Sequence, residues 1–297
     1  MGSLLCLNCS DNSKIVSDIF SIQNYIDNEI DSSLQTNSNL IFQHLTHYRK
    51  IKGDGNCFYR SISFLLLESL LLEKDIPVLA SIIHEIKNDS IPLLLCHSPP
   101  SLTLSSFLMD SERLKNAISN PLCSLLQLLQ QEEKWEEHRD GNSSTLKTNM
   151  NGKVKERSDY YQLVNEKGGI ARRLWEIFNE DFFFDLGMVI YVRSKIYSFL
   201  QEKEKMKFYE PFIDDIEQLK KILIIFDKEA ESSIIAITAE VFNINLEVYI
   251  LYIMGKRRER SLGVFVERHE PKFEKNHKRR ILKLFFRPGH YDVGYNF

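Results

Sequence analysis

The sequence lacks a long apolar run and an excess of charge of one sign. No uninterrupted apolar stretch reaches the ~18 residues that a membrane-spanning helix needs, because Glu68 interrupts one leucine-rich run and polar residues interrupt the segment 237–254. The net charge is −3 and the isoelectric point is near 6.3, which does not favour binding to nucleic acid. We therefore expect a soluble protein with no membrane span and no nucleic-acid partner.

Cysteine is also scarce, and its spacing forms no regular framework. The five cysteines are Cys6, Cys9, Cys57, Cys96 and Cys123. An odd count with no secretion signal favours free thiols in a reducing compartment, so we expect a cytoplasmic protein, with the nucleus as a second location. Cys6 and Cys9 form a lone Cys-x-x-Cys without the second pair that a zinc site needs, and no metal is expected.

Helical patterns come first along the chain, and strand patterns gather at its end. Helices are predicted from Cys57 to about Lys74, from Pro77 to Lys87, from about Ser119 to Trp135, from Glu231 to Val241, and within 160–213. Strands are predicted at 244–254 and 263–269, followed by two strands within 280–297 that are joined near Pro288 and Gly289. This order indicates an α+β fold in which helices wrap a small, mostly antiparallel sheet.

The chain is expected to have two parts, which differ in their likeness to a known family of proteins. Residues 1–39 are predicted to form a partly flexible N-terminal extension, and residues 40–297 a single domain. A polar insert near 136–158 interrupts this domain, because the segment has almost no large apolar side chains and cannot bury enough surface to offset its ordering entropy.

The stretch KGDGNCFYRS, residues 52–61, places a thiol at the start of a predicted helix. The unpaired N–H groups and the dipole of that helix favour a negative charge on Cys57. Gly53 and Gly55 allow a sharp turn that aims backbone N–H groups at a substrate carbonyl, as an oxyanion hole requires. A cysteine before an apolar helix is more often a small packed side chain, so this stretch alone leaves both interpretations open.

A possible base lies near the other end of the chain. His290 begins a predicted strand directly after Pro288 and Gly289, and Asp292 follows two residues later. Side chains at i and i+2 of a strand share a face, so the carboxylate can orient the imidazole, as a catalytic triad requires. Position alone does not exclude His44 and His47 as alternatives, and a histidine after a Pro-Gly turn is usually solvated.

The strings GDGNCFYRS and RPGHYDVGY closely resemble the ovarian-tumour-domain (OTU) cysteine proteases, and within them the otubains. The basic lead-in HYRKIK and the segment SSIIAITAEVFNINLEVYIL are similar as well, and in outline the likeness covers about residues 40–297. The resemblance implies a papain-like core of the OTU type. It also implies a thiol-dependent deubiquitinase that cleaves the isopeptide bond between the C-terminal glycine of ubiquitin and a lysine, without a cofactor.

The same resemblance assigns roles to six residues. Cys57 would be the nucleophile, His290 the general base and then acid, and Asp292 the residue that orients His290. The oxyanion-hole loop would be shaped by Asp54 and would include Gly55 and Asn56. The chain departs from the family in the 233 residues that separate Cys57 from His290, in Ser61, and at Ser232 and Ser233, where relatives often carry histidine or aspartate.

The resemblance implies ubiquitin and polyubiquitin chains as partners of a monomeric enzyme. The alternative is a non-catalytic regulator that binds ubiquitin or a ubiquitin-conjugating enzyme, because some members of the family restrain such enzymes without cutting. A third interpretation is a papain-like protease that acts on ordinary peptides.

Overall fold

The computed structural model describes residues 14–30, 43–88, 111–140, 169–254, 261–273 and 279–297. Its centre is a six-stranded sheet with the strand order β1-β2-β6-β5-β3-β4. The strands are β1 Val16–Ser21, β2 His47–Ile51, β3 Asn245–Met254, β4 Ser261–His269, β5 Ile281–Arg287 and β6 His290–Tyr295. The pair β3–β5 is parallel and the other pairs are antiparallel. The predicted α+β class, with a mostly antiparallel sheet, is confirmed.

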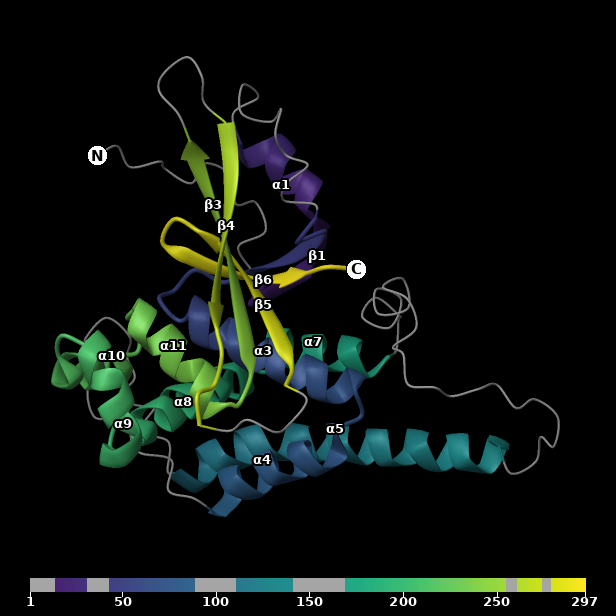
Figure 1. Ribbon diagram of the computed structural model, residues 1–297. Helices are drawn as coiled ribbons and strands as arrows, with labels where there is room; N and C mark the ends of the chain where they lie inside the picture. Colours follow the sequence, from purple (N-terminus) through teal and green to yellow (C-terminus); the bar gives the residue numbers. More distant parts are fainter. Residues whose placement is uncertain (1–13, 31–42, 89–110, 141–168, 255–260, 274–278) are drawn as a thin grey trace.

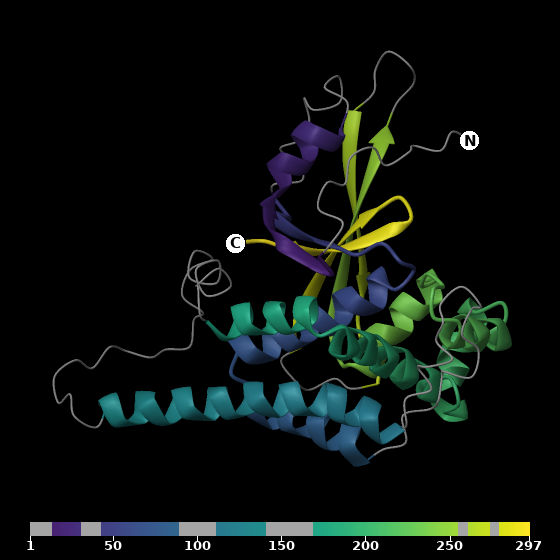
Figure 2. The same cartoon turned by 180° about the vertical axis from the view of Figure 1, so that it is seen from behind.

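Helices cover one face of the sheet in two layers, and the first helix packs against the other face (Figures 1 and 2). The helices are α1 Ile22–Glu29, α3 Cys57–Leu72, α4 Ile76–Asn88, α5 Ser111–Asp140, α7 Ile170–Glu180, α8 Phe182–Phe199, α9 Lys203–Tyr209, α10 Ile216–Ile224 and α11 Ser232–Val241, with a 3₁₀ turn at Glu210–Phe212. Helices α3, α7 and α8 lie between the sheet and the outer pair α4 and α5.

The burial of α3 follows from its sequence, CFYRSISFLLLESLLL, which is apolar on almost every side. A helix of this kind has no face suited to water, so it becomes the centre of the core. It contacts strand β6 on one side and helix α8 on the other. Its position in the core also buries its first residue, Cys57, which is 3% exposed.

The strong sequence patterns correspond to the observed elements. The helix predicted to end near Lys74 ends at Leu72, the one predicted over 77–87 spans Ile76–Asn88, and the one predicted near 119–135 extends over Ser111–Asp140. Helices α7, α8 and α9 lie in the described part, 169–213, of the segment with helical spacing. The four predicted strands are confirmed as β3 to β6.

Residues 16–29 form two elements that the sequence patterns did not predict. Strand β1 pairs with β2, and helix α1 begins directly after it, where the hydroxyl of Ser21 accepts a hydrogen bond from the backbone N–H of Asn24. The sheet therefore includes residues from both sides of position 39. The division of the chain at that position stays a prediction, and the polar insert predicted near 136–158 lies outside the described residues from 141 onward.

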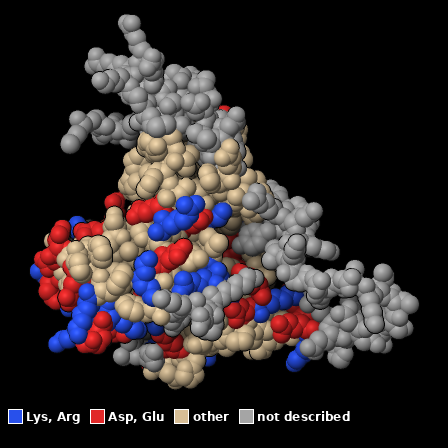
Figure 3. Space-filling view, viewed as in Figure 1, with Lys and Arg blue, Asp and Glu red and all other residues tan. Residues whose placement is uncertain are grey.

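The charged surface is mixed in sign. On the face seen in Figure 3, lysine and arginine side chains lie among aspartates and glutamates over the helical part of the molecule. Within the described ranges, no helix combines the length and the apolar character needed to cross a bilayer.

Candidate active site

The sheet brings the two ends of the chain together at one place. Strand β2 pairs with β6, with Arg49 opposite Val293 and His47 opposite Tyr295. The turn after β2 leads directly into α3 and Cys57, while β6 begins at His290. The thiol and the imidazole are therefore neighbours although 233 residues separate them in the sequence.

His290 and Asp292 form the pair that strand geometry predicts. The Nε2 atom of His290 lies 2.9 Å from Oδ1 of Asp292. Asp292 is fully buried, and its Oδ1 also accepts a hydrogen bond of 2.9 Å from the backbone N–H of Ile51. Its other oxygen, Oδ2, lies 2.7 Å from Nε of Arg287. Two hydrogen bonds therefore involve Oδ1 and an ion pair involves Oδ2, and the carboxylate can fix the orientation of the imidazole.

The electrostatic surroundings of His290 favour the imidazolium. Burial lowers the pKa of His290, but hydrogen bonds and charge interactions with Asp292 and Cys57 outweigh it and raise this pKa to about 9. Because Nε2 is bound to Asp292, the ring presents Nδ1 to Cys57. A Cβ added at Gly53 would lie 3.4 Å from Nδ1 and Cε1, so glycine leaves the ring room against the turn. This arrangement suits a thiolate–imidazolium pair, the nucleophilic form of a catalytic cysteine.

Asp54 and Arg60 hold the turn in front of Cys57. Oδ1 of Asp54 accepts a hydrogen bond of 3.1 Å from the N–H of Asn56, and both of its oxygens bind the guanidinium of Arg60 at 2.9 Å. Burial raises the pKa of Asp54, but Arg60 outweighs it and keeps this pKa below its ordinary value. Arg60 also binds Asp185 of α8, at 2.7 and 3.0 Å. The turn is therefore fastened to two helices.

Gly55 and Asn56 complete the turn, and few other residues would fit at these two positions. Gly55 has a φ of +76°, and an added Cβ would lie 2.0 Å from the carbonyl oxygen of Asp227, in the connection between α10 and α11. A side chain at this position would thus be both strained and blocked. Asn56 is buried, and its Oδ1 accepts a hydrogen bond of 2.8 Å from Arg193 of α8.

The alternative histidines occupy other places. His47 pairs with Tyr295 at the end of β6 opposite His290, and its Nδ1 lies 3.0 Å from the hydroxyl of Thr46. The ring of His44 lies 5.9 Å from that of Tyr249. Of the histidines considered from the sequence, His290 is the one that is hydrogen-bonded to a buried aspartate and whose pKa is raised by Cys57.

The unusual Ser61 has a structural contact. It is fully buried one turn after Cys57 in α3, and its hydroxyl donates a hydrogen bond of 3.3 Å to the carbonyl of Tyr291 in β6. Ser61 therefore ties the nucleophile helix to the strand of the base. Ser232 and Ser233 occupy the first turn of α11.

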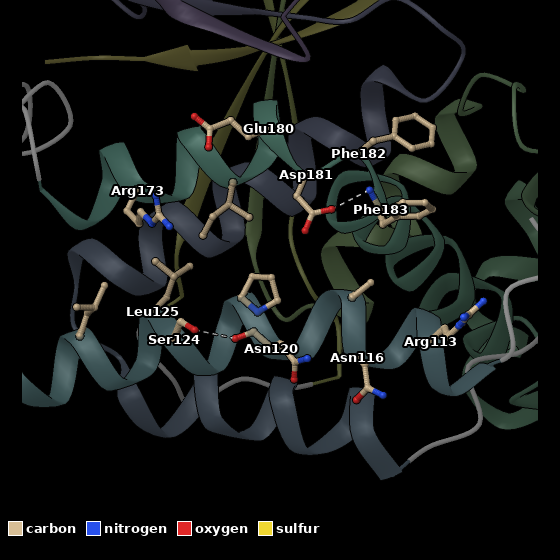
Figure 4. Close-up of a pocket in the computed structure, with 14 residues that line it drawn as sticks. Arg113, Asn116, Asn120, Ser124, Leu125, Arg173, Glu180, Asp181, Phe182 and Phe183 are labelled. Carbon is tan, nitrogen blue, oxygen red and sulfur yellow. Dashed lines mark hydrogen bonds between the residues drawn. The ribbon is translucent and has the colours of Figure 1, made fainter.

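A separate groove of about 1180 Å³ lies between α5, α7 and the start of α8. Phe182 and Phe183 form one end of it, and Asn116, Asn120 and Ser124 lie along α5 (Figure 4). None of the residues that line this groove belongs to the set around Cys57. The candidate active site is thus defined by its chemistry and not by this groove.

A family model described as Peptidase C65 Otubain matches residues 10–107 and 162–296. The chain belongs to the otubain family. The otubain family is a family of cysteine peptidases, which agrees with the thiol of Cys57, the imidazole of His290 and the carboxylate of Asp292 found together. A comparison with curated proteins found no match.

The otubain fold is also found among solved structures. A ceOTUB1 complex with ubiquitin aldehyde and UBC13~Ub has a TM-score of 0.50 and 18% identity, with 96% of this chain and 94% of that chain covered. An h/ceOTUB1 complex with ubiquitin aldehyde and UBC13~Ub has a TM-score of 0.51 and 18% identity, with 95% and 90% covered. At this identity the likeness establishes the fold.

Sequence reasoning did not identify four residues that support this otubain site, namely Arg60, Asp185, Arg193 and Arg287. Arg60 stands inside the motif that marked Cys57, and an arginine at the start of an apolar predicted helix was a usable signal. Asp185 and Arg193 lie more than 120 residues away in an apolar helix. Charged residues inside such a helix require buried partners, but the sequence does not say which partners.

Proposed function

We propose that this chain is a deubiquitinase that hydrolyses the isopeptide bond between the C-terminal glycine of ubiquitin and a lysine side chain. The observation that carries the proposal is the set Cys57, His290 and Asp292, in which His290 is hydrogen-bonded to Asp292 and interacts with Cys57, inside an otubain fold. The ubiquitin aldehyde in the similar ceOTUB1 complex supports ubiquitin as the substrate.

The first half of the reaction uses the thiolate and the imidazolium. The Cys57 thiolate attacks the carbonyl carbon of the ubiquitin glycine, and the resulting oxyanion is stabilised by backbone N–H groups at the start of α3 and the preceding turn. His290 then gives its proton to the lysine nitrogen as the C–N bond breaks. The free amine leaves, and ubiquitin remains bound to Cys57 as a thioester.

The second half restores the enzyme. Neutral His290 accepts a proton from a water molecule, whose oxygen attacks the thioester carbonyl. The C–S bond then breaks, the thiolate forms again, and the released carboxylic acid of ubiquitin loses its proton to solvent. Throughout both halves Asp292 keeps Nε2 of His290 engaged, so that Nδ1 faces the sulfur. Asp54 serves by holding the turn, and Gly55 and Asn56 by providing its shape.

The decisive experiment uses a ubiquitin probe that carries an electrophile at its C-terminus. The wild-type chain should be captured covalently, and Cys57→Ala should not be captured. Cys123→Ala is the matched control, because Cys123 is the other free thiol among the described residues and lies on α5. Capture that persists in Cys57→Ala would contradict the mechanism. A panel of differently linked diubiquitins then defines the substrate, and short peptides cut as efficiently would favour a general peptidase.

A second function, restraint of a ubiquitin-conjugating enzyme without cleavage, is supported by the UBC13~Ub component of the similar complex. The two functions separate in the Cys57→Ala variant. If this variant slows ubiquitin transfer by a conjugating enzyme as well as the wild type does, the binding role is independent of catalysis.

We also propose that the protein is located in the cytoplasm, which fractionation of cells would test.

A further inference from the structure

Arg193 is a buried cation at the back of the candidate active site. It lies on α8 and is 1% exposed. Its guanidinium donates hydrogen bonds to backbone carbonyls within 222–228, at distances from 2.8 to 3.4 Å, and to Oδ1 of Asn56 at 2.8 Å. It also stacks 3.8 Å from the centre of the Tyr59 ring. The Arg193 side chain thus links the backbone of residues 222–228 to Asn56, the residue before the nucleophile.

Asn56 occupies the N-cap position of α3 but does not cap this helix. Asparagine at this position usually accepts a hydrogen bond from an N–H of the first turn and has an extended backbone. Three other helices here follow that rule: Ser21, Asp181 and Asp215 have ψ values of 147°, 93° and 102°, and each side chain accepts from its own helix. Asn56 has φ −104° and ψ 3°, and its side chain makes no such bond.

The backbone of Asn56 therefore lies in the sparsely populated bridge region, where active-site residues are often found. Its ψ angle sets the orientation of the peptide group that joins it to Cys57, and so the direction of the Cys57 N–H. A rotation to the extended form would turn this N–H away and let the side-chain oxygen fill a donor of the first turn. Both changes would remove positive backbone groups from the neighbourhood of the sulfur.

We propose that Arg193 is a positioning residue, which binds the side chain of Asn56 so that this residue cannot cap α3. The Cys57 N–H then keeps its direction, and the first turn of α3 stays open to the thiolate and to the oxyanion of the substrate. This inference rests on the proposed function for its catalytic meaning. Its structural part, the open helix end beside Cys57, is testable without ubiquitin.

Arg193→Met keeps an unbranched apolar stem but removes the guanidinium, so Oδ1 of Asn56 loses its donor. Hydrolysis of a ubiquitin C-terminal fluorogenic substrate should then show kcat lower by about 10²-fold, as when one oxyanion donor is lost, with KM little changed. Alkylation of Cys57 by iodoacetamide is followed by mass spectrometry of its peptide, and its rate is plotted against pH to give an alkylation profile. This profile should shift to higher pH because the helix end stabilises the thiolate less.

A double variant separates positioning from general packing. In Arg193→Met/Asn56→Ala no side chain remains that could cap α3, so the alkylation profile should return toward that of Asn56→Ala alone. The matched control is Arg49→Met, because Arg49 is also buried, at 3% exposure, and binds the Ser17 carbonyl and the Tyr295 hydroxyl away from the turn. Its alkylation profile should match that of the wild type.

Two results would overturn the inference. One is an alkylation profile of Arg193→Met that coincides with that of Arg49→Met. The other is a double variant in which the effects of Arg193→Met and Asn56→Ala on alkylation simply add. If Arg193→Met does not fold, Arg193→Lys replaces it, since an ammonium cannot reach Asn56 and the carbonyls together, and an unshifted profile in that folded variant also refutes the inference. If the wild-type protein does not cleave ubiquitin substrates but the variants still show the expected alkylation shifts, the proposed function is refuted and the positioning role of Arg193 is not.

Discussion

Replacing Asp292 by asparagine tests the electrostatic role of the buried carboxylate. The substitution keeps the size of the side chain and an oxygen that can bind His290, but it removes the negative charge. Because that charge stabilises the imidazolium, the pKa of His290 should fall. The fall should be visible as a shift of the alkaline limb of the pH–rate profile, which reports the loss of the imidazolium proton.

The magnitude follows from the pKa of His290. A rise from the ordinary 6.5 to about 9 corresponds to about 3 kcal/mol, since one pH unit is worth about 1.4 kcal/mol. Burial opposes this rise, and Asp292 and Cys57 together produce it. If Asp292 accounts for half of the rise in the pKa of His290, its loss should move the alkaline limb of the pH–rate profile from about pH 9 to about pH 8. The value of kcat/KM at neutral pH should fall by about 10²- to 10⁴-fold, because the imidazole is also held less firmly.

The same shift predicts how stability depends on pH. The pKa of His290 is higher in the folded than in the unfolded chain, so its contribution to stability is fully present below about pH 6.5 and is lost as the pH rises through about 9. Urea unfolding at pH 6 and pH 9.5 should show a smaller difference in Asp292→Asn than in the wild type.

The assay is hydrolysis of a fluorogenic ubiquitin substrate from pH 5 to pH 10. Arg287→Gln is the control, because it removes the cation 2.7 Å from Asp292 Oδ2 while the carboxylate stays. Loss of a nearby positive charge cannot lower the pKa of His290, so the alkaline limb of this variant should stay in place or move upward. An alkaline limb that remains near pH 9 in Asp292→Asn would refute the reasoning.

Three further substitutions probe the supports of the site. Gly55→Ala should lower the free energy of unfolding by at least about 1–3 kcal/mol, the usual cost of a strained backbone, and abolish probe capture, since φ is +76° and a backbone carbonyl blocks the new Cβ. Arg60→Met should cost about 3–5 kcal/mol in denaturant unfolding, because two carboxylates lose their cation. Tyr295→Phe should cost about 1–3 kcal/mol with probe capture retained, since its hydroxyl joins buried Glu68 and Arg49 away from Cys57.

Sequence patterns predicted the elements whose burial has one simple cause. Helix α3 is apolar all round, and β5 and β6 meet at a Pro-Gly turn, so both could be recognised locally. Strand β1 has only two residues that are fully shielded, and α1 has eight residues. Such short, half-exposed elements have weak periodicity and are stabilised by their tertiary neighbours, and no local pattern predicted them.

The candidate site divides in the same way. Cys57, His290 and Asp292 could be predicted because a motif and the two-residue repeat of a strand carry them. The bonds of Arg60 to Asp185 and of Arg193 to Asn56 join positions 125 and 137 residues apart. Nothing in the spacing of these residues encodes the contact, because it arises only when α8 packs against α3.

The long separation of nucleophile and base is explained by the position of two strands. Because β2 and β6 are neighbours in the middle of the sheet, the turn before α3 and the first residue of β6 meet whatever the length of chain between them. Helix α5 ends at Asp140 and α7 begins at Ile170, on the side of the molecule away from the start of α3 (Figures 1 and 2). The geometry of the site therefore depends on strand order, and the 233-residue span is no argument against the assignment.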